Sequence, residues 1–203
     1  MNTLWKTSVN KAFYGFLAYT LLSGIIASIA SWADSASSIA SFASGKADFS
    51  LFDFSTLVNI LAIVGFVYYF LGIKGMRDSA ASTPLAEGTA QMYTGTLIGL
   101  IGSIVRIIPF LGFIGAIVSL VGFVFMMLGV SKIKKLKELN ALAAKGAGQL
   151  FTMMILQIVS FVIDIIMIIP FLGEVIAFIL SIVIFIYAFL GWKNFSNSEL
   201  PQA

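Results

Sequence analysis

The chain has 203 residues, of which 60% are hydrophobic and 10% are charged, and its mean hydropathy is +1.04. A soluble domain is roughly 45–50% apolar and about 25% charged, so the composition excludes a soluble enzyme, a disordered chain and a nucleic-acid-binding domain. With no Cys and no His, the chain also lacks the usual soft metal ligands and the commonest general base, and its net charge is only +3. We therefore expect an integral membrane protein with no metal, no cofactor and no nucleic-acid partner.

The first predicted membrane span covers residues 12–33. Lys6 and Lys11 precede 22 residues without a charge, which is longer than the apolar core of about 7–15 residues in a signal peptide. We interpret this stretch as a retained span. A Ser- and Ala-rich loop with interspersed aromatic residues follows at 34–54, on the external side. This loop is either an interfacial segment resting among lipid headgroups or a lid or partner-docking element on the outer face.

Charge-poor stretches predict five further spans, because a helix needs about 20 apolar residues to cross a bilayer. The spans are residues 55–73, 91–108, 110–131, 149–169 and 172–192. The third and fourth are joined by Pro109 to Gly112, and the fifth and sixth by Pro170 to Gly173. Proline ends the first helix of each pair and glycine allows the chain to reverse. The expected fold is all-α, a single transmembrane domain of six helices arranged as three hairpins.

The distribution of basic residues supports this count of spans. Six spans place both termini and the loops 74–90 and 132–148 on one side, together with ten of the twelve Lys and Arg residues. The positive-inside rule makes that side the cytoplasm. We expect a protein of the bacterial inner membrane with both termini cytoplasmic.

The three hairpins resemble one another in sequence. Residues 107–112 and 168–173 both read IIPFLG, and a glycine followed by a lysine closes the hairpins near Lys74, Lys132 and Lys193. We interpret residues 12–73, 91–131 and 149–192 as three copies of one unit. The alternative is chance similarity between apolar segments of low diversity.

Two charged residues lie within predicted spans, Arg106 and Asp164, and Glu174 follows the second PFLG turn. Ionisable residues inside a membrane are costly and suggest a function. Three interpretations remain open. The residues form an ion pair between hairpins, they face a solvated outer vestibule without a specific role, or Asp164 is a cation or proton site.

Small residues and lysines suggest two kinds of contact. Gly95, Gly99 and Ser103 are spaced four apart, which lets helices approach closely, either within the bundle or in a dimer or a complex with a partner. A basic stripe after the fourth span is suited to anionic lipid headgroups, although it also serves to anchor orientation. The stripe consists of Lys132, Lys134, Lys135 and Lys137.

The PFLG turns and the glycine–lysine hairpin ends, over about residues 57–193, resemble small multi-pass bacterial inner-membrane proteins of unknown function. The resemblance implies tandem hydrophobic hairpins and no catalytic residues. The length and span count are also similar to the vitamin-binding S subunits of energy-coupling transporters, although the threefold repeat is not. We therefore expect a non-enzymatic accessory or scaffold protein that packs with lipids, partner subunits or a second copy. The alternative is a small-solute or ion transporter, or the substrate-binding subunit of one.

Overall fold

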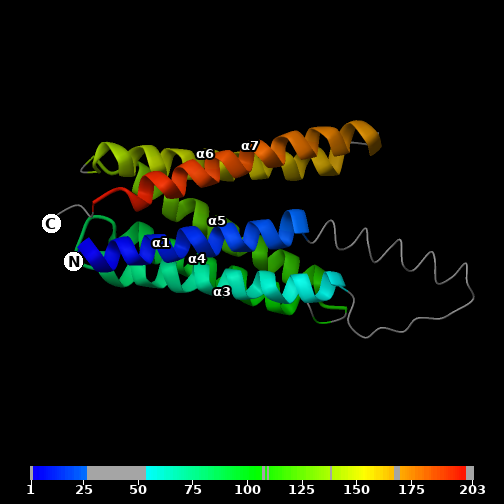
Figure 1. The fold of residues 1–203 in the computed structure, drawn as a ribbon, viewed down its shortest axis with the longest axis horizontal. Coiled ribbons are helices and arrows are strands. Elements are labelled where there is room, and N and C mark those ends of the chain that lie inside the picture. Colours follow the sequence, from blue (N-terminus) through cyan, green and yellow to red (C-terminus); the bar gives the residue numbers. More distant parts are fainter. Residues whose placement is uncertain are drawn as a thin grey trace, which may run out of the picture.

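A computed structural model describes residues 2–26, 54–106, 108, 110–137, 139–166 and 170–199. Within these ranges the chain is helical, without strands (Figure 1). The helices are α1 (Asn2–Thr20), continued by the π-helical segment η1 (Leu21–Ile26), α3 (Phe54–Ala80), α4 (Ala86–Val105), α5 (Gly112–Lys134), α6 (Ala141–Ile166) and α7 (Pro170–Ser196). The start of α1 and the end of α7 lie at the same end of the bundle, which we call the terminal end.

Four of the described helices are long and apolar enough, by length and composition, to cross a membrane. They contain the segments Ile60–Ala80, Gly112–Lys134, Ala141–Ile163 and Ile179–Ser196. In lipid, a helix satisfies its own backbone polar groups, which is why apolar sequences of this length adopt it. The all-α class is therefore confirmed with four candidate spans. The described parts of α1 and α4 do not reach the same threshold, so the count of six remains a prediction.

The helices extend past the charge-free stretches at the terminal end. Helix α3 continues through Lys74 to Ala80, α4 begins at Ala86, and α6 begins at Ala141. A charge ends an apolar stretch but not a helix, so the connections are shorter than the predicted loops 74–90 and 132–148. Side chains complete the turns: Thr83 Oγ1 donates to the Ala80 carbonyl at 2.8 Å, and Asn140 Oδ1 accepts from the Ala143 N–H at 2.7 Å.

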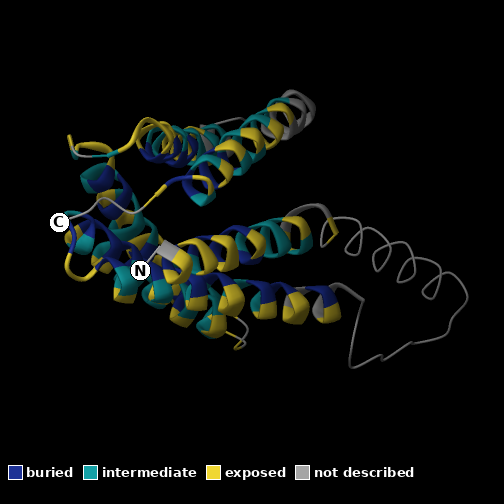
Figure 2. Ribbon diagram, turned by 60° about the vertical axis from the view of Figure 1, so that its left-hand side comes forward, coloured by how far each residue is buried: buried dark blue, intermediate teal, exposed yellow. Residues whose placement is uncertain are grey.

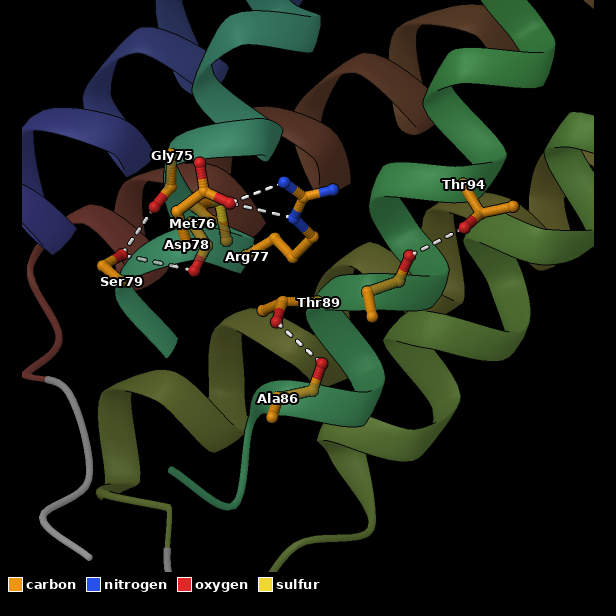
Figure 3. A network of polar contacts seen from close by, with 9 residues as sticks. Gly75, Met76, Arg77, Asp78, Ser79, Ala86, Thr89 and Thr94 are labelled. Carbon is orange, nitrogen blue, oxygen red and sulfur yellow. Dashed lines mark hydrogen bonds and ion pairs between the residues drawn. The ribbon is translucent and has the colours of Figure 1, made fainter. Parts of the chain in front are cut away.

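Helix α3 ends in a polar cluster at this end of the bundle (Figure 3). Arg77 binds Asp78 at 2.7 Å and lies over the ring of Tyr93, with 4.0 Å between its guanidinium carbon and the ring centroid. Hydroxyl groups of Ser79 and Thr89 donate to carbonyls three or four residues earlier in their helices. This pattern satisfies a hydroxyl within its own helix and suits it to an apolar environment.

The turn between α4 and α5 differs from the expectation that glycine provides the reversal. Phe110 has the left-handed backbone, with φ of 69°, and its side chain is fully exposed. Gly112 is the first residue of α5, and Gly173 lies within α7, so both glycines belong to helices. Pro170 begins α7, a position where the missing N–H of proline costs nothing. Pro109 lies outside the described residues.

The six helices form a closed ring. The most extensive contacts pair α1 with α3, α4 with α5, and α6 with α7, as expected for three hairpins. Smaller contacts join α3 to α4, α5 to α6, and α7 back to α1. Each described helix therefore packs against two neighbours, and the ring has an interior that all six can line.

Helices α4 and α5 approach closely because each of them places a glycine at their contact every seven residues. Gly88, Gly95 and Gly102 on α4 face Gly129, Gly122 and Gly115 on α5, respectively. A Cβ atom placed on Gly95 would lie 2.5 Å from the backbone nitrogen of Met126, so no side chain fits there. Of the residues expected to mediate helix packing, Gly95 thus packs inside the chain against α5. Gly99 instead turns toward Phe66 of α3, where a Cβ would have an ordinary contact of 3.5 Å.

Buried residues gather at the terminal end, and exposed residues follow the outer side of the helices (Figure 2). The core there centres on fully buried side chains of five helices, including Trp5, Ile73, Met92, Ile133 and Trp192. Large exposed hydrophobic residues such as Val64, Leu120, Val124, Ile158 and Ile182 face outward along the helices. An apolar exterior of this extent is typical of a surface that contacts lipid.

Candidate functional site

A cavity of about 230 Å³ lies inside the ring, and all six helices line it. Each helix contributes at least one side chain: Tyr19, Tyr69, Thr96, Met126, Met153 and Trp192, in chain order. We call this space the central cavity. An aliphatic cavity of roughly 150 Å³ is enough to hold benzene, so the central cavity has room for a small organic molecule.

The walls of the central cavity are mainly aromatic rings and methionine side chains. Tyr69 meets Trp192 edge-on, with ring centroids 5.8 Å apart, and Phe16 meets Tyr69 at 5.8 Å. Met126 and Met153 complete the apolar surface. Aromatic rings and thioethers form favourable contacts with ring-containing or apolar ligands, and thioether side chains adapt to their shape.

Some polar groups in the wall are satisfied and others are not. The Tyr69 hydroxyl donates to the Met126 sulfur at 3.9 Å, and the Thr96 hydroxyl donates to the Met92 carbonyl at 2.8 Å. In contrast, the indole Nε1 of Trp192 and the Oγ of Ser119 are buried without a hydrogen-bond partner among the described residues, and both residues line the cavity. A buried unpaired donor costs about 1–3 kcal/mol. Both atoms have almost no accessible surface, so they lie within the packed wall beside the cavity.

Arg106 lies at the far end of the central cavity. It caps the C-terminus of α4, where its positive charge also faces the negative end of the helix dipole. Met92, at the other end of the lining on α4, is about 21 Å away at a rise of about 1.5 Å per residue. No described residue forms an ion pair or hydrogen bond with the Arg106 guanidinium. The cavity therefore extends from an aromatic floor at the terminal end to a cationic outer end.

A second cavity of about 360 Å³ lies between α1 with η1 and the α6–α7 hairpin. It shares Phe16, Tyr19 and Gln157 with the central cavity, so the two spaces are adjacent. Hydroxyl groups of Thr20, Ser23 and Ser160 line its wall. The π-helical geometry of η1, a distortion that is frequent at functional sites, lies beside it.

The predicted acidic partners of Arg106 lie on α6 and α7. Asp164 is near the end of α6 and Glu174 is in the second turn of α7, and their side chains fall outside the described residues. The ion pair therefore stays a prediction, as does an ion site at Asp164. Residues 34–53 of the predicted external loop also lie outside the described residues.

The lysine stripe is divided among different environments. Lys132 forms an ion pair with Glu87 of α4, and the Lys134 ammonium lies 4.6 Å from the ring centroid of Phe151. Lys135 caps α5, and Lys137 follows it. Two of the four lysines thus have partners within the chain, and contact with anionic lipids stays a prediction.

Sequence reasoning did not identify the central cavity, although a signal for it exists. Small, polar or flexible residues recur every three or four positions along α4, from Met92 through Thr96, Gly99 and Ser103 to Arg106. In an otherwise apolar helix, such a stripe marks the face turned away from lipid. Gly99 and Ser103 of this stripe belong to the predicted helix-packing motif, and in the structure both line the cavity together with Arg106.

Searches against protein-family models, curated proteins and solved structures found no match to this chain.

Proposed function

We propose that the protein is a non-enzymatic, six-span membrane protein that binds a small molecule in the central cavity, as small-solute transporters and substrate-binding membrane subunits do. The observation that carries this proposal is the closed ring of helices around a cavity that every helix lines. The wall of aromatic rings and thioethers, ending at the Arg106 cation, adds a chemical reason for a ligand.

The scaffold hypothesis has less support than the ligand-binding one. It relied on small residues that would present a face to a partner, but Gly95 packs against α5 and Gly99 faces Phe66 of α3. The scaffold hypothesis also expects a solid apolar bundle, whereas the described helices enclose a cavity. Mass spectrometry of proteins and lipids that co-purify in mild detergent tests this alternative, and a stoichiometric partner protein would restore it.

Accessibility of engineered cysteines tests the proposed cavity, because the natural chain contains no Cys. We expect Met126→Cys and Met153→Cys to react with the small reagent methyl methanethiosulfonate in membranes, since the thiolate needed for reaction forms where water enters. Matched controls are Val124→Cys, which is 49% exposed on the outer face, and the fully buried Ile73→Cys. Both controls should stay unlabelled, and equal labelling at all four positions would contradict an accessible cavity.

The proposed topology has three hairpins, both termini in the cytoplasm and a bacterial inner membrane as its location. It is supported by the common end of the first and last helices and by the basic residues gathered there. We expect a membrane-impermeant maleimide to label Phe110→Cys in intact cells, because this turn lies at the opposite end. Ser82→Cys should react only after permeabilisation. The reverse pattern would invert the topology, and labelling of both in intact cells would reject six spans.

A further inference from the structure

The described lining of the cavities carries positive charge and no negative charge. Among the described residues that line the two cavities, Arg106 alone carries a formal charge. The unpaired polar atoms in the lining, on Ser119 and Trp192, belong to groups that can donate hydrogen bonds. The described lining thus offers a cation without a carboxylate, which suits an anionic ligand.

Arg106 and Ser119 both border the contact between Gly102 of α4 and Gly115 of α5. The glycine pair Gly102 and Gly115 brings the two helices together there, since a Cβ on Gly115 would lie 2.7 Å from the Gly102 carbonyl oxygen. A Cβ on Gly115 would also lie 2.5 Å from Arg106 Cγ, and one on Gly102 would contact the Ser119 hydroxyl. The absence of side chains on both glycines therefore leaves room for the Arg106 stem against Gly115 and for the Ser119 hydroxyl against Gly102.

The remaining lining suits an apolar body. Inward from Arg106, the wall consists mainly of aromatic rings and of thioethers such as Met126 and Met153, down to the Trp192 floor. Edge-to-face ring contacts and sulfur–ring contacts both favour an aromatic ligand. An arginine fork binds a carboxylate with two parallel hydrogen bonds, and a serine hydroxyl that rotates toward the carboxylate adds a third.

We infer that the central cavity binds a small aromatic monoanion, with its carboxylate on Arg106 and Ser119 and its ring between the methionines and the aromatic floor. This inference rests on the proposed ligand-binding function and specifies the class of ligand. It also assigns Arg106 a direct ligand contact, whereas a structural pair with Asp164 would engage the same guanidinium.

Equilibrium dialysis of the protein in lipid nanodiscs tests the inference, with 2-naphthoate as the anionic probe and 2-naphthol as its neutral counterpart. Binding to empty nanodiscs is subtracted. We expect saturable binding of both probes, with naphthoate the tighter. Arg106→Gln should weaken naphthoate binding about tenfold or more and naphthol binding less than twofold, because a hydrogen bond to a charged group is worth about 1.5–3 kcal/mol. Ser119→Ala should weaken naphthoate binding to a smaller extent.

Two controls separate direct contact from a structural role. Arg77→Gln removes a guanidinium outside the cavity and should leave both probes unaffected. Asp164→Asn should leave naphthoate binding unchanged or strengthen it by releasing Arg106, whereas a loss as large as that of Arg106→Gln would overturn the direct contact.

The outcomes distinguish this inference from the proposed function. Equal binding of naphthol and naphthoate, unaffected by Arg106→Gln, would overturn the anionic ligand and leave a ligand-binding cavity. Absence of binding by either probe, in a protein whose Met126→Cys variant is labelled by the thiol reagent, would likewise overturn the inference. Absence of both binding and labelling would reject the cavity itself.

Discussion

Gly95→Ala is expected to destabilise the protein by about 2–3 kcal/mol, because overpacking a close contact typically costs about 1–3 kcal/mol and this contact involves backbone. The new Cβ would lie 2.5 Å from the Met126 nitrogen and 2.6 Å from the Gly122 carbonyl oxygen. Neither atom can rotate away, so α4 and α5 would have to separate. The midpoint of thermal or denaturant-induced unfolding in detergent measures the effect.

Gly99→Ala is the matched control, one helical turn further along α4. Its Cβ would meet only the Phe66 ring at 3.5 Å, an ordinary contact. Alanine is favoured over glycine in a helix by about 1 kcal/mol, so the stability should stay the same or rise. Equal destabilisation by both substitutions would show that α4 uses the four-residue spacing, not the seven-residue spacing described above.

Trp192→Ala is expected to cost about 3–5 kcal/mol, the usual range for removing a large aromatic side chain from a packed interior. Trp192 is 1% exposed and contacts Phe16, Tyr69 and Phe195 through its ring. Its loss would extend the central cavity toward the terminal end, and the surrounding rings cannot close the space without separating the helices. Unfolding measurements in detergent and in lipid check this prediction.

Leu190→Ala serves as the control on the same helix. Leu190 is 39% exposed on the outer face, where lipid or detergent can occupy the space of the missing atoms. Its loss should change stability by less than about 1 kcal/mol. A cost for Trp192→Ala as small as this would mean that α7 is not part of the cavity wall.

The close packing of α4 and α5 and the proposed ligand site depend on the same residues. The glycines that bring α4 and α5 together also place Arg106 and Ser119 at the outer end of the cavity. A substitution such as Gly102→Ala should therefore disturb both stability and ligand binding, whereas Trp192→Ala should retain the cationic end while removing the floor.

The sequence predicted the features that depend on local composition. Apolar stretches of membrane length predicted helices, and PFLG turns predicted the pairing of neighbouring helices into hairpins. Boundaries were less accurate, because a charge at Lys74 ends an apolar stretch while the helix continues to Ala80. The reversal after α4 was assigned to glycine, whereas the left-handed residue is Phe110. Local sequence marks a turn without deciding which residue adopts its strained conformation.

The cavity could not be predicted from the sequence, because it depends on which faces of the six helices meet. The backbones of Gly95 and Gly99 both lie against α5, yet a Cβ on Gly95 would point at α5 and one on Gly99 at Phe66 of α3. Only the crossing of the helices decides this difference. Arg106 was recognised as unusual from its position among apolar residues, but its place at the end of an aromatic cavity follows from closure of the ring by α1 and α7. The sequence by itself thus determined an all-helical, membrane-type chain, since apolar composition and backbone hydrogen bonding are local. Only the tertiary structure determines the interior cavity, because contacts between helices that are distant in the sequence create it.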